Sequence, residues 1–186
     1  MAREATGAGA PGPQAPARLL TPRLELRLFA PADHEPYARI CADPQVMRYV
    51  GAGQPNTPEI TWRSMAAVLG HWALKGHGIW AVQLRDGPLI GHAGFIDVPG
   101  WPGFELAWLL GREHWGHGYA REAATAAREV AFGTLGRDRV ISLIRPQNEP
   151  SIRLARALGA QHEGDVELMG SAAQVHVHER SAVVAP

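Results

Sequence analysis

The chain has 186 residues, of which 46% are hydrophobic and 19% charged, and its 18 basic residues balance 18 acidic ones at a pI near 7.1. This length suits one soluble domain, and the neutral balance excludes the net positive field that binding to nucleic acid draws on. No apolar run approaches the length of a membrane span. The single Cys41 excludes an internal disulfide, and the start of the chain lacks an apolar signal core, so we expect a cytoplasmic protein.

The first segment, residues 1–17, is rich in Ala, Gly and Pro without any period, which is typical of a flexible tail. The folded domain is therefore expected to span residues 18–186. Within it, Leu24, Leu26 and Leu28 alternate with charged residues and predict a half-buried strand.

Two helices are predicted next. Helical spacing after Asp33 indicates a helix that stops at Asp43-Pro44. A second helix should begin near Thr57, whose hydroxyl is suited to cap it, and should end at Gly76. The core is expected to take up several tryptophans: Trp62, Trp72, Trp80 and Trp108.

Residues 79–85 and 89–98 predict an antiparallel hairpin with a tight turn between them, and residues 104–110 predict another strand. The strand at residues 106–110 is followed by a glycine loop (111–118), a helix (120–132), a strand (140–144) and a second helix (150–158). A strand, a helix and a strand in this order imply a parallel strand pair. Two strands close the chain, at residues 166–169 and 173–184. The sequence therefore predicts a single α/β domain with a mixed, seven-stranded sheet and about four helices.

A glycine loop, Trp115-Gly-His-Gly-Tyr-Ala120, lies between a predicted strand and a predicted helix. Small residues let successive backbone amides turn inward, and the helix N-terminus adds positive potential, so the loop is suited to a diphosphate. Alone, such a loop is more often only a tight turn. It lacks the Gly-Lys-Ser/Thr end of a P-loop and the third glycine and acidic residue of a dinucleotide fold, which leaves a diphosphate without a metal.

The context of this loop carries a resemblance to a known family. The segments Glu105–Leu110, Trp115–Ala124 and Asn148–Ala160 resemble the cofactor-binding half of the GNAT acyltransferase superfamily. The upstream segments Leu20–Leu28 and Asp43–Val50 are similar to its RimJ/RimL-like branch, which includes ribosomal-protein N-terminal acetyltransferases. The resemblance implies a GNAT fold and acetyl-CoA as cosubstrate.

The family's cofactor residues are carried over onto matching positions. The diphosphate loop falls on Trp115, Gly116, His117, Gly118, Tyr119 and Ala120, with Trp115 in place of the usual polar residue. The resemblance also implies that the pantetheine arm pairs with the strand end at Leu109 and Leu110. Asn148 and Ser151 match residues near the thiol end of the cofactor.

Acetyl transfer to an amine needs a base, because an ammonium with a pKa near ~10 is mostly protonated at neutral pH. Glu105 is the predicted general base, since its strand leads into the glycine loop and some superfamily members use a glutamate at this distance. The alternative is a carboxylate at a strand end that orders an arginine or the acceptor site. Ser151 is the candidate acid, in competition with a role as helix cap. The pairs His114/His117 and His176/His178 lack a third ligand at recognised spacing, so no metal is expected.

The sequence thus predicts an N-acetyltransferase that acts on a protein N-terminus or a small amine, with neither nucleic acid nor membrane as partner. Oligomeric state stays open, a homodimer included. A GNAT-fold sensor or scaffold that binds acyl-CoA without turnover is the alternative. A binding module for an apolar ligand, with no affinity for CoA, is the third hypothesis.

Overall fold

The protein, in a computed structural model, is described over residues 13–180. An eight-stranded sheet has the order β1-β2-β3-β4-β5-β6-β8-β7. Its strands are β1 Arg18–Leu20, β2 Leu24–Arg27, β3 Ile79–Leu84, β4 Leu89–Ile96, β5 Glu105–Leu110, β6 Arg139–Ile144, β7 Gln161–Leu168 and β8 Ser171–Glu179. Its helices are α1 His34–Cys41, α2 Pro44–Met47, α3 Pro58–Lys75, α4 Tyr119–Glu129 and α5 Glu149–Ala157. A π-helical turn, Val130–Thr134, extends α4.

The single-domain mixed sheet is confirmed, with eight strands where seven were predicted and five helices where about four were predicted. The additional strand is β1, which pairs antiparallel with β2, and the additional helix is the four-residue α2. The parallel pair is β5 with β6, and the other neighbours in the sheet are antiparallel.

The predicted helix caps are present. The Thr57 hydroxyl accepts a hydrogen bond from the amide of Ile60 at the start of α3, and Gly76 ends the helix with a left-handed φ of 69°. Trp62 lies outside the predicted core: it is 50% exposed and packs edge-on against His34. The side of α3 that packs against the sheet buries Thr61, Met65 and Trp72, which are spaced four and seven residues apart. Trp62 is one position away from this stripe and therefore faces outward.

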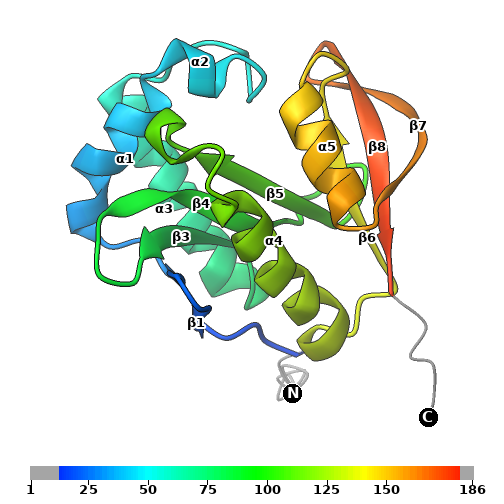
Figure 1. The fold of residues 1–186 in the computed structure, drawn as a ribbon, viewed down its shortest axis with the longest axis horizontal. Helices are drawn as coiled ribbons and strands as arrows, with labels where there is room; N and C mark the ends of the chain where they lie inside the picture. The colour runs from blue at the N-terminus through cyan, green and yellow to red at the C-terminus, as the bar shows by residue number, and fades with distance from the viewer. Residues whose placement is uncertain (1–12, 181–186) are drawn as a thin grey trace, which may run out of the picture.

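Two layers of helices sandwich the sheet. Figure 1 shows α4 crossing in front of the strands, with α3 behind them and α1 beside it. The α4 side buries a core of Leu26, Trp80, Phe95, Leu106 and three alanines of the helix, Ala123, Ala124 and Ala127. The α1 and α3 side buries a second core that includes Phe29, Ile40, Met65 and Leu109. Strand β5 therefore turns alternate side chains to both layers.

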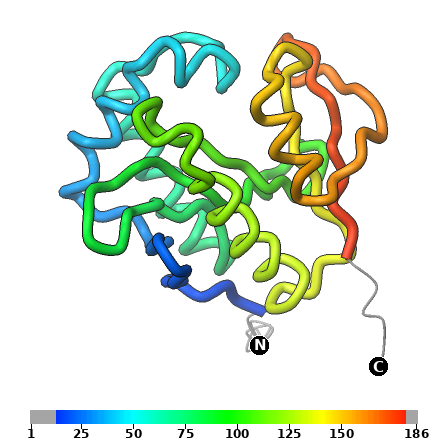
Figure 2. The backbone as a smooth tube through the Cα atoms, in the orientation of Figure 1, coloured from blue at the N-terminus to red at the C-terminus, as the bar shows by residue number. Residues whose placement is uncertain are grey.

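The C-terminal part of the sheet stands apart from the rest. In Figure 2 the segment after α2 and the helix α5 face each other above the sheet, on opposite sides of the boundary between β5 and β6.

The predicted tail lies mostly outside the described residues. Of its last part, Ala15 donates a backbone hydrogen bond to Gly76 (2.9 Å) and Pro16 accepts one from the indole of Trp80 (3.0 Å). Within residues 13–180, no helix is both long and apolar enough to cross a membrane.

Gly91 on β4 fixes the distance between β4 and β5. Its φ is 151°, and a Cβ built there would lie 2.1 Å from the carbonyl oxygen of Leu109. We expect Gly91→Ala to destabilise the protein by about 3 kcal/mol or more, because neither backbone can move without breaking the ladder. Gly70→Ala, on the exposed face of α3 where a Cβ meets nothing within 4 Å, should instead stabilise it by about 0.5–1 kcal/mol. Denaturant unfolding of the two variants checks this, and equal stabilities would contradict it.

Candidate active site

Strands β5 and β6 separate almost as soon as they meet. Their pairing register contains one position, Glu105 opposite Ile141. Beyond it, side chains replace the backbone ladder: the Glu105 carboxylate accepts from the amide of Leu143 (3.3 Å), and the Ser142 hydroxyl donates to the carbonyl of Leu106 (2.7 Å). The sheet is therefore open along the rest of β5.

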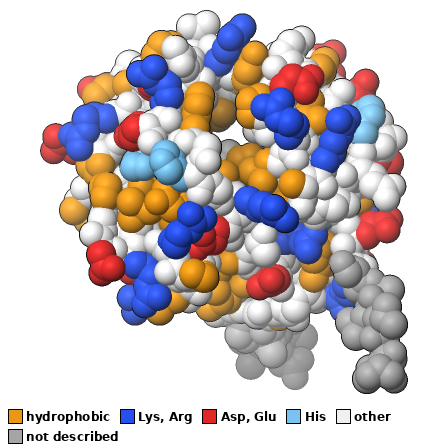
Figure 3. Space-filling view, in the orientation of Figure 1, with side chains coloured by type: hydrophobic (Ala, Val, Ile, Leu, Met, Phe, Trp, Pro, Cys, Tyr) orange, Lys and Arg blue, Asp and Glu red, His pale blue; other side chains and the backbone are white. Residues whose placement is uncertain are grey.

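Two cavities meet at this opening. Cavity A, about 550 Å³, lies on the α1 and α3 side and reaches the tip of the β7–β8 hairpin. Cavity B, about 740 Å³, lies beside the glycine loop and the N-termini of α4 and α5. Both are lined by the same six residues at their junction: Tyr49, Val50, Trp108, Leu109, Asn148 and Ser151. Figure 3 shows the surface hollowed near its centre, with hydrophobic side chains inside and Lys or Arg side chains around it.

The predicted glycine loop borders cavity B. Gly116 and Gly118 have φ values of 78° and 79°, a left-handed conformation that glycine adopts without strain. Gly118 is the N-cap of α4 and has no side chain to satisfy the first helical amides. Of the predicted loop residues, all but His117 line the cavity. The His117 ring points elsewhere, since it stacks on Tyr119 and bonds the carbonyl of Trp115 (2.8 Å).

An arginine in the turn just before β2 supports the loop. Arg23 donates to the carbonyl of His117 (2.9 Å), forms an ion pair with Glu122 (2.6 Å) and lies 4.6 Å from the centre of the Tyr119 ring. Glu122 also accepts from the amide of Arg23 and from the hydroxyl of Thr21 (2.6 Å). The loop is thus held to the start of β2. Sequence reasoning missed Arg23, which carries no local signal of this role.

The open edge of β5 exposes alternate backbone groups. Phe104 and Leu106 turn their carbonyls toward β6. By alternation along a strand, Trp108 and Leu110 turn their amides and carbonyls to the same side. Leu109 pairs with His92 on β4 and contributes its side chain to both cavities. The Leu110 carbonyl accepts from the Trp115 indole (2.8 Å), which gives the unusual tryptophan of the loop a structural role.

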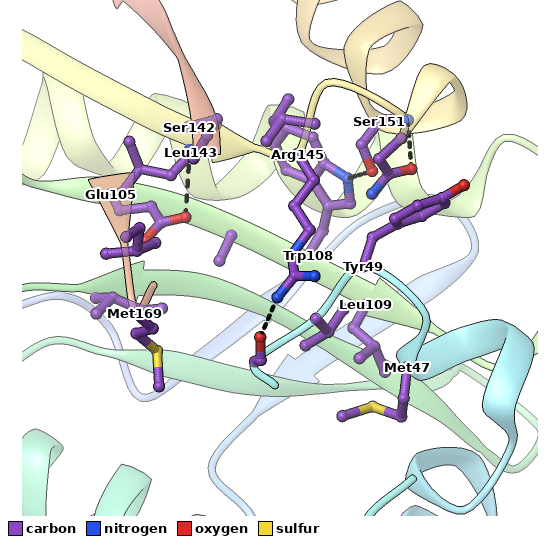
Figure 4. Close-up of a pocket in the computed structure, with 18 of the residues that line it drawn as sticks. Met47, Tyr49, Glu105, Trp108, Leu109, Ser142, Leu143, Arg145, Ser151 and Met169 are labelled. Atoms are coloured by element: carbon purple, nitrogen blue, oxygen red, sulfur yellow. Dashed lines mark hydrogen bonds between the residues drawn. The ribbon is translucent and has the colours of Figure 1, made fainter. Parts of the chain in front are cut away.

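Asn148 and Ser151 lie at the junction of the cavities, at the start of α5. Asn148 is the helix N-cap, and its side chain accepts from the amide of Ser151 (3.4 Å). The capping role considered for Ser151 is therefore filled by Asn148. The Ser151 hydroxyl oxygen accepts from the Trp108 indole (3.3 Å), and because an indole can only donate, the hydroxyl proton stays available. Figure 4 shows this contact on one side of the cavity and Glu105 on the other.

Glu105 lines cavity A and is 6% exposed. Burial raises the pKa of its carboxyl from about 4.5 to about 7, and this effect outweighs hydrogen bonds from Trp101 (2.6 Å) and the amide of Leu143, which lower it. A carboxyl with a pKa near 7 can accept and release a proton at neutral pH. Trp101 lies in the turn before β5, and sequence reasoning did not include it in the site.

Three further residues of cavity A were also missed. Tyr37 on α1 forms a 2.6 Å hydrogen bond to Nδ1 of His92, whose pKa burial lowers to about 4, so that the imidazole is neutral at neutral pH. Arg145 follows β6 and donates to the carbonyl of Gly51 (2.6 Å) on the segment after α2. Each pair joins residues that are distant in the chain. Within residues 13–180 no three His, Cys, Asp or Glu side chains are grouped to hold a metal ion.

The chain matches known proteins over most of its length. The acetyltransferase (GNAT) domain family matches residues 23–161. The uncharacterized N-acetyltransferase p20 of Bacillus licheniformis is 31% identical over 149 residues, 78% of this chain and 83% of p20. An acetyltransferase structure from Agrobacterium tumefaciens is 32% identical with a TM-score of 0.78, covering 96% of this chain and all of that one. Mycobacterium smegmatis RimJ in complex with CoA-disulfide, 18% identical with a TM-score of 0.69, covers 87% of this chain and 84% of its own and shares the fold.

The raised pKa of Glu105 makes stability depend on pH. The folded protein binds the carboxyl proton more tightly than the unfolded chain, so the free energy of unfolding should fall as pH rises from about 4.5 to about 7. Glu105→Gln lacks this loss and should be more stable than wild type at pH 8 by up to about 3 kcal/mol, with the difference gone below pH 4.5.

Unfolding curves of wild type and Glu105→Gln at both pH values test this. Glu129→Gln, at an exposed site on α4, is the control for removal of a charge. The pKa of Glu105, followed by ¹³C NMR, should be higher in Trp101→Phe than in wild type, because the hydrogen bond from the indole stabilises the carboxylate and lowers this pKa. A Glu105 titration at its ordinary value would contradict both expectations.

Proposed function

The chain belongs to the acetyltransferase (GNAT) family, and from that premise we propose that it transfers an acetyl group from acetyl-CoA to a primary amine by direct attack in a ternary complex. The observation that most supports this is the junction of two cavities at the open edge of β5. One cavity offers anion-binding groups and the other a buried carboxyl, so two substrates can meet there.

Cavity B fits the cofactor by its chemistry. The uncapped amides at the start of α4 and the left-handed Gly116 and Gly118 border this cavity and leave backbone N–H groups without side-chain partners. Arg48, Arg121 and His114 line the same cavity and suit the phosphates. The open amide and carbonyl of Trp108 and the amide of Leu110 are suited to the pantetheine arm, with the Leu109 side chain beside it. Acetyl-CoA supplies the acetyl group as a thioester whose thiolate departs.

Glu105 is the general base of the proposed reaction. Its carboxylate takes the proton of the ammonium, directly or through an ordered water, and frees the nitrogen lone pair to attack the thioester carbonyl carbon. The amide of Trp108 or Leu110 stabilises the oxyanion that forms. When the C–S bond breaks, the thiolate takes a proton from the Ser151 hydroxyl or a water, and this donor is reprotonated by the second proton that the nitrogen loses as it becomes an amide.

Assignment to the RimJ/RimL-like branch is part of this proposal. It is supported by the two upstream segments, Leu20–Leu28 and Asp43–Val50, which include the cavity residues Met47 and Tyr49. Cytoplasmic location and a homodimer stay predictions. A non-catalytic acyl-CoA sensor would bind CoA but release no free thiol with any amine.

Acetyl-CoA should raise the melting temperature, and pantetheine without phosphates should raise it much less, because the loop amides bind the diphosphate. Gly118→Val should abolish the shift, since a β-branched residue is strained at a φ of 79° and the loop would have to leave the conformation that presents its amides. Gly136→Val is the matched control: its φ is 63°, a Cβ meets nothing within 4 Å, and it lies away from both cavities. A normal shift in folded Gly118→Val would place the cofactor elsewhere.

Glu105→Gln should keep its affinity for CoA and lose a factor of about 10² to 10⁴ in turnover at neutral pH. The loss should shrink as pH rises, because more of the acceptor is then already a neutral amine. Release of free thiol, followed from pH 6 to 10 and compared with Glu129→Gln, measures this. Wild-type turnover in Glu105→Gln would contradict its role as the base. A loss that stays constant up to the pKa of the amine would instead assign Glu105 to acceptor binding.

A further inference from the structure

We propose that the amine acceptor is a small monoamine whose apolar body carries a carboxylate, as in an apolar amino acid, and that Arg145 receives this carboxylate. The inference rests on the proposed function, because it assigns the acceptor to cavity A. A volume of about 550 Å³ is that of a site for one small molecule.

The charges that line cavity A are few. Among the described residues, Glu105 is its one carboxylate and Arg145 its one Lys or Arg. Most of the remaining wall is apolar and includes Met47, Ile60 and Leu143. A ligand that fills this cavity therefore needs one group for each charge and an apolar body for the rest of the wall.

Arg145 and Glu105 both line cavity A. The amide of Leu143 donates to the Glu105 carboxylate, and Arg145 follows Leu143 by two residues, just after the end of β6. At about 3.3 Å per residue, the backbone of Arg145 lies about 7 Å from that of Leu143. Figure 4 shows the Arg145 side chain crossing the cavity toward the segment after α2.

The guanidinium has donors left over. One bond goes to the carbonyl of Gly51 (2.6 Å), and Gly53 leaves room for the group, since a Cβ there would lie 3.3 Å from Nη1. A guanidinium carries five N–H donors, and within residues 13–180 no carboxylate lies within ion-pair distance of Arg145. It does not line cavity B, so its charge is not directed at the cofactor phosphates. A ligand carboxylate would complete its pairing, in the planar geometry that arginine favours.

The same charges disfavour polyamines and aminoglycosides. Their second ammonium would lie against Arg145 or against apolar walls with no carboxylate to pair with, and a buried charge without a partner is costly. Cavity A thus selects for one positive group, the ammonium that reacts, and against further ones.

The test uses acceptor pairs that differ only in the carboxylate: L-phenylalanine with phenethylamine, L-leucine with isoamylamine, and L-methionine with 3-methylthiopropylamine. Free-thiol release gives kcat/KM for each with acetyl-CoA, and spermidine is run beside them. The quantity compared is the acid-to-amine ratio in wild type and in Arg145→Gln, because the solution pKa of each amine cancels between enzymes.

Wild type should favour the acids over spermidine, and Arg145→Gln should lower the acid-to-amine ratio by about tenfold to a hundredfold, as expected for a lost bond to a charged group. Arg145→Lys, which keeps the charge without the planar fork, should fall between. Arg153→Gln, an exposed arginine on α5 that lines neither cavity, should leave the ratio unchanged.

Three results would overturn the inference: preference for spermidine, preference for a peptide that begins with the same residue over the free acid, or an equal loss for acid and amine in Arg145→Gln. The last would mean that Arg145 only positions the Gly51 segment. Failure of the proposed function looks different, because no amine would then release thiol from bound acetyl-CoA. Calorimetric titration of L-phenylalanine and phenethylamine into wild type and Arg145→Gln would still decide the role of Arg145.

Discussion

The separation of β5 from β6 is the constraint on which the rest of the structure depends. A sheet that opens in its interior leaves amides and carbonyls without partners, which is costly when they are buried. Here two side chains take over, Glu105 for the amide of Leu143 and Ser142 for the carbonyl of Leu106. The Ser142 hydroxyl is also hydrogen-bonded to the buried His178 (3.0 Å), which holds it in position to replace the missing backbone partner. These side-chain hydrogen bonds lower the cost of separating the two strands, and the separation lets the two cavities meet.

The opening also sets the electrostatics of the site. A carboxylate that replaces a backbone acceptor must be buried as deeply as the sheet, and this burial brings the pKa of Glu105 to about 7. The cations Arg48 and Arg121 line one cavity and Arg145 the other. In the proposed reaction, the cofactor phosphates would be attracted to the arginines of cavity B and an acceptor carboxylate to Arg145 in cavity A. The two ligands would thus be drawn to opposite sides of the thioester.

Much of the fold was accessible from the sequence because its signals are local. Alternation in β2, the caps Thr57 and Gly76, and the switch to strand, glycine loop and helix each depend on adjacent residues. The glycine loop was visible in the same way, but its assignment to the cofactor, and that of Glu105 to the base, depended on the resemblance to a family. Strand β1 has three residues, too few to show a period, and β7 begins at Gln161 in a polar segment whose partner β8 decides its conformation.

The missed side chains have a common cause. Tyr37 meets His92 across 55 residues of chain, and Arg145 meets Gly51 across 94, so tertiary contacts alone assign them to the site. No spacing rule covers such distances. Resemblance to a family supplied the cofactor loop, but the acceptor cavity depends on residues that no motif contains.

The contact of Arg23 with Glu122 closes a chain segment of 99 residues, and it is the support of the glycine loop. Contacts so far apart in sequence are slow to form, because the entropy of closing the segment must be overcome before they contribute. The loop is therefore expected to acquire its shape late, once the start of β2 has docked against α4. A ligand of this loop would then report on the packing of two segments that are 99 residues apart, rather than on its own neighbourhood alone.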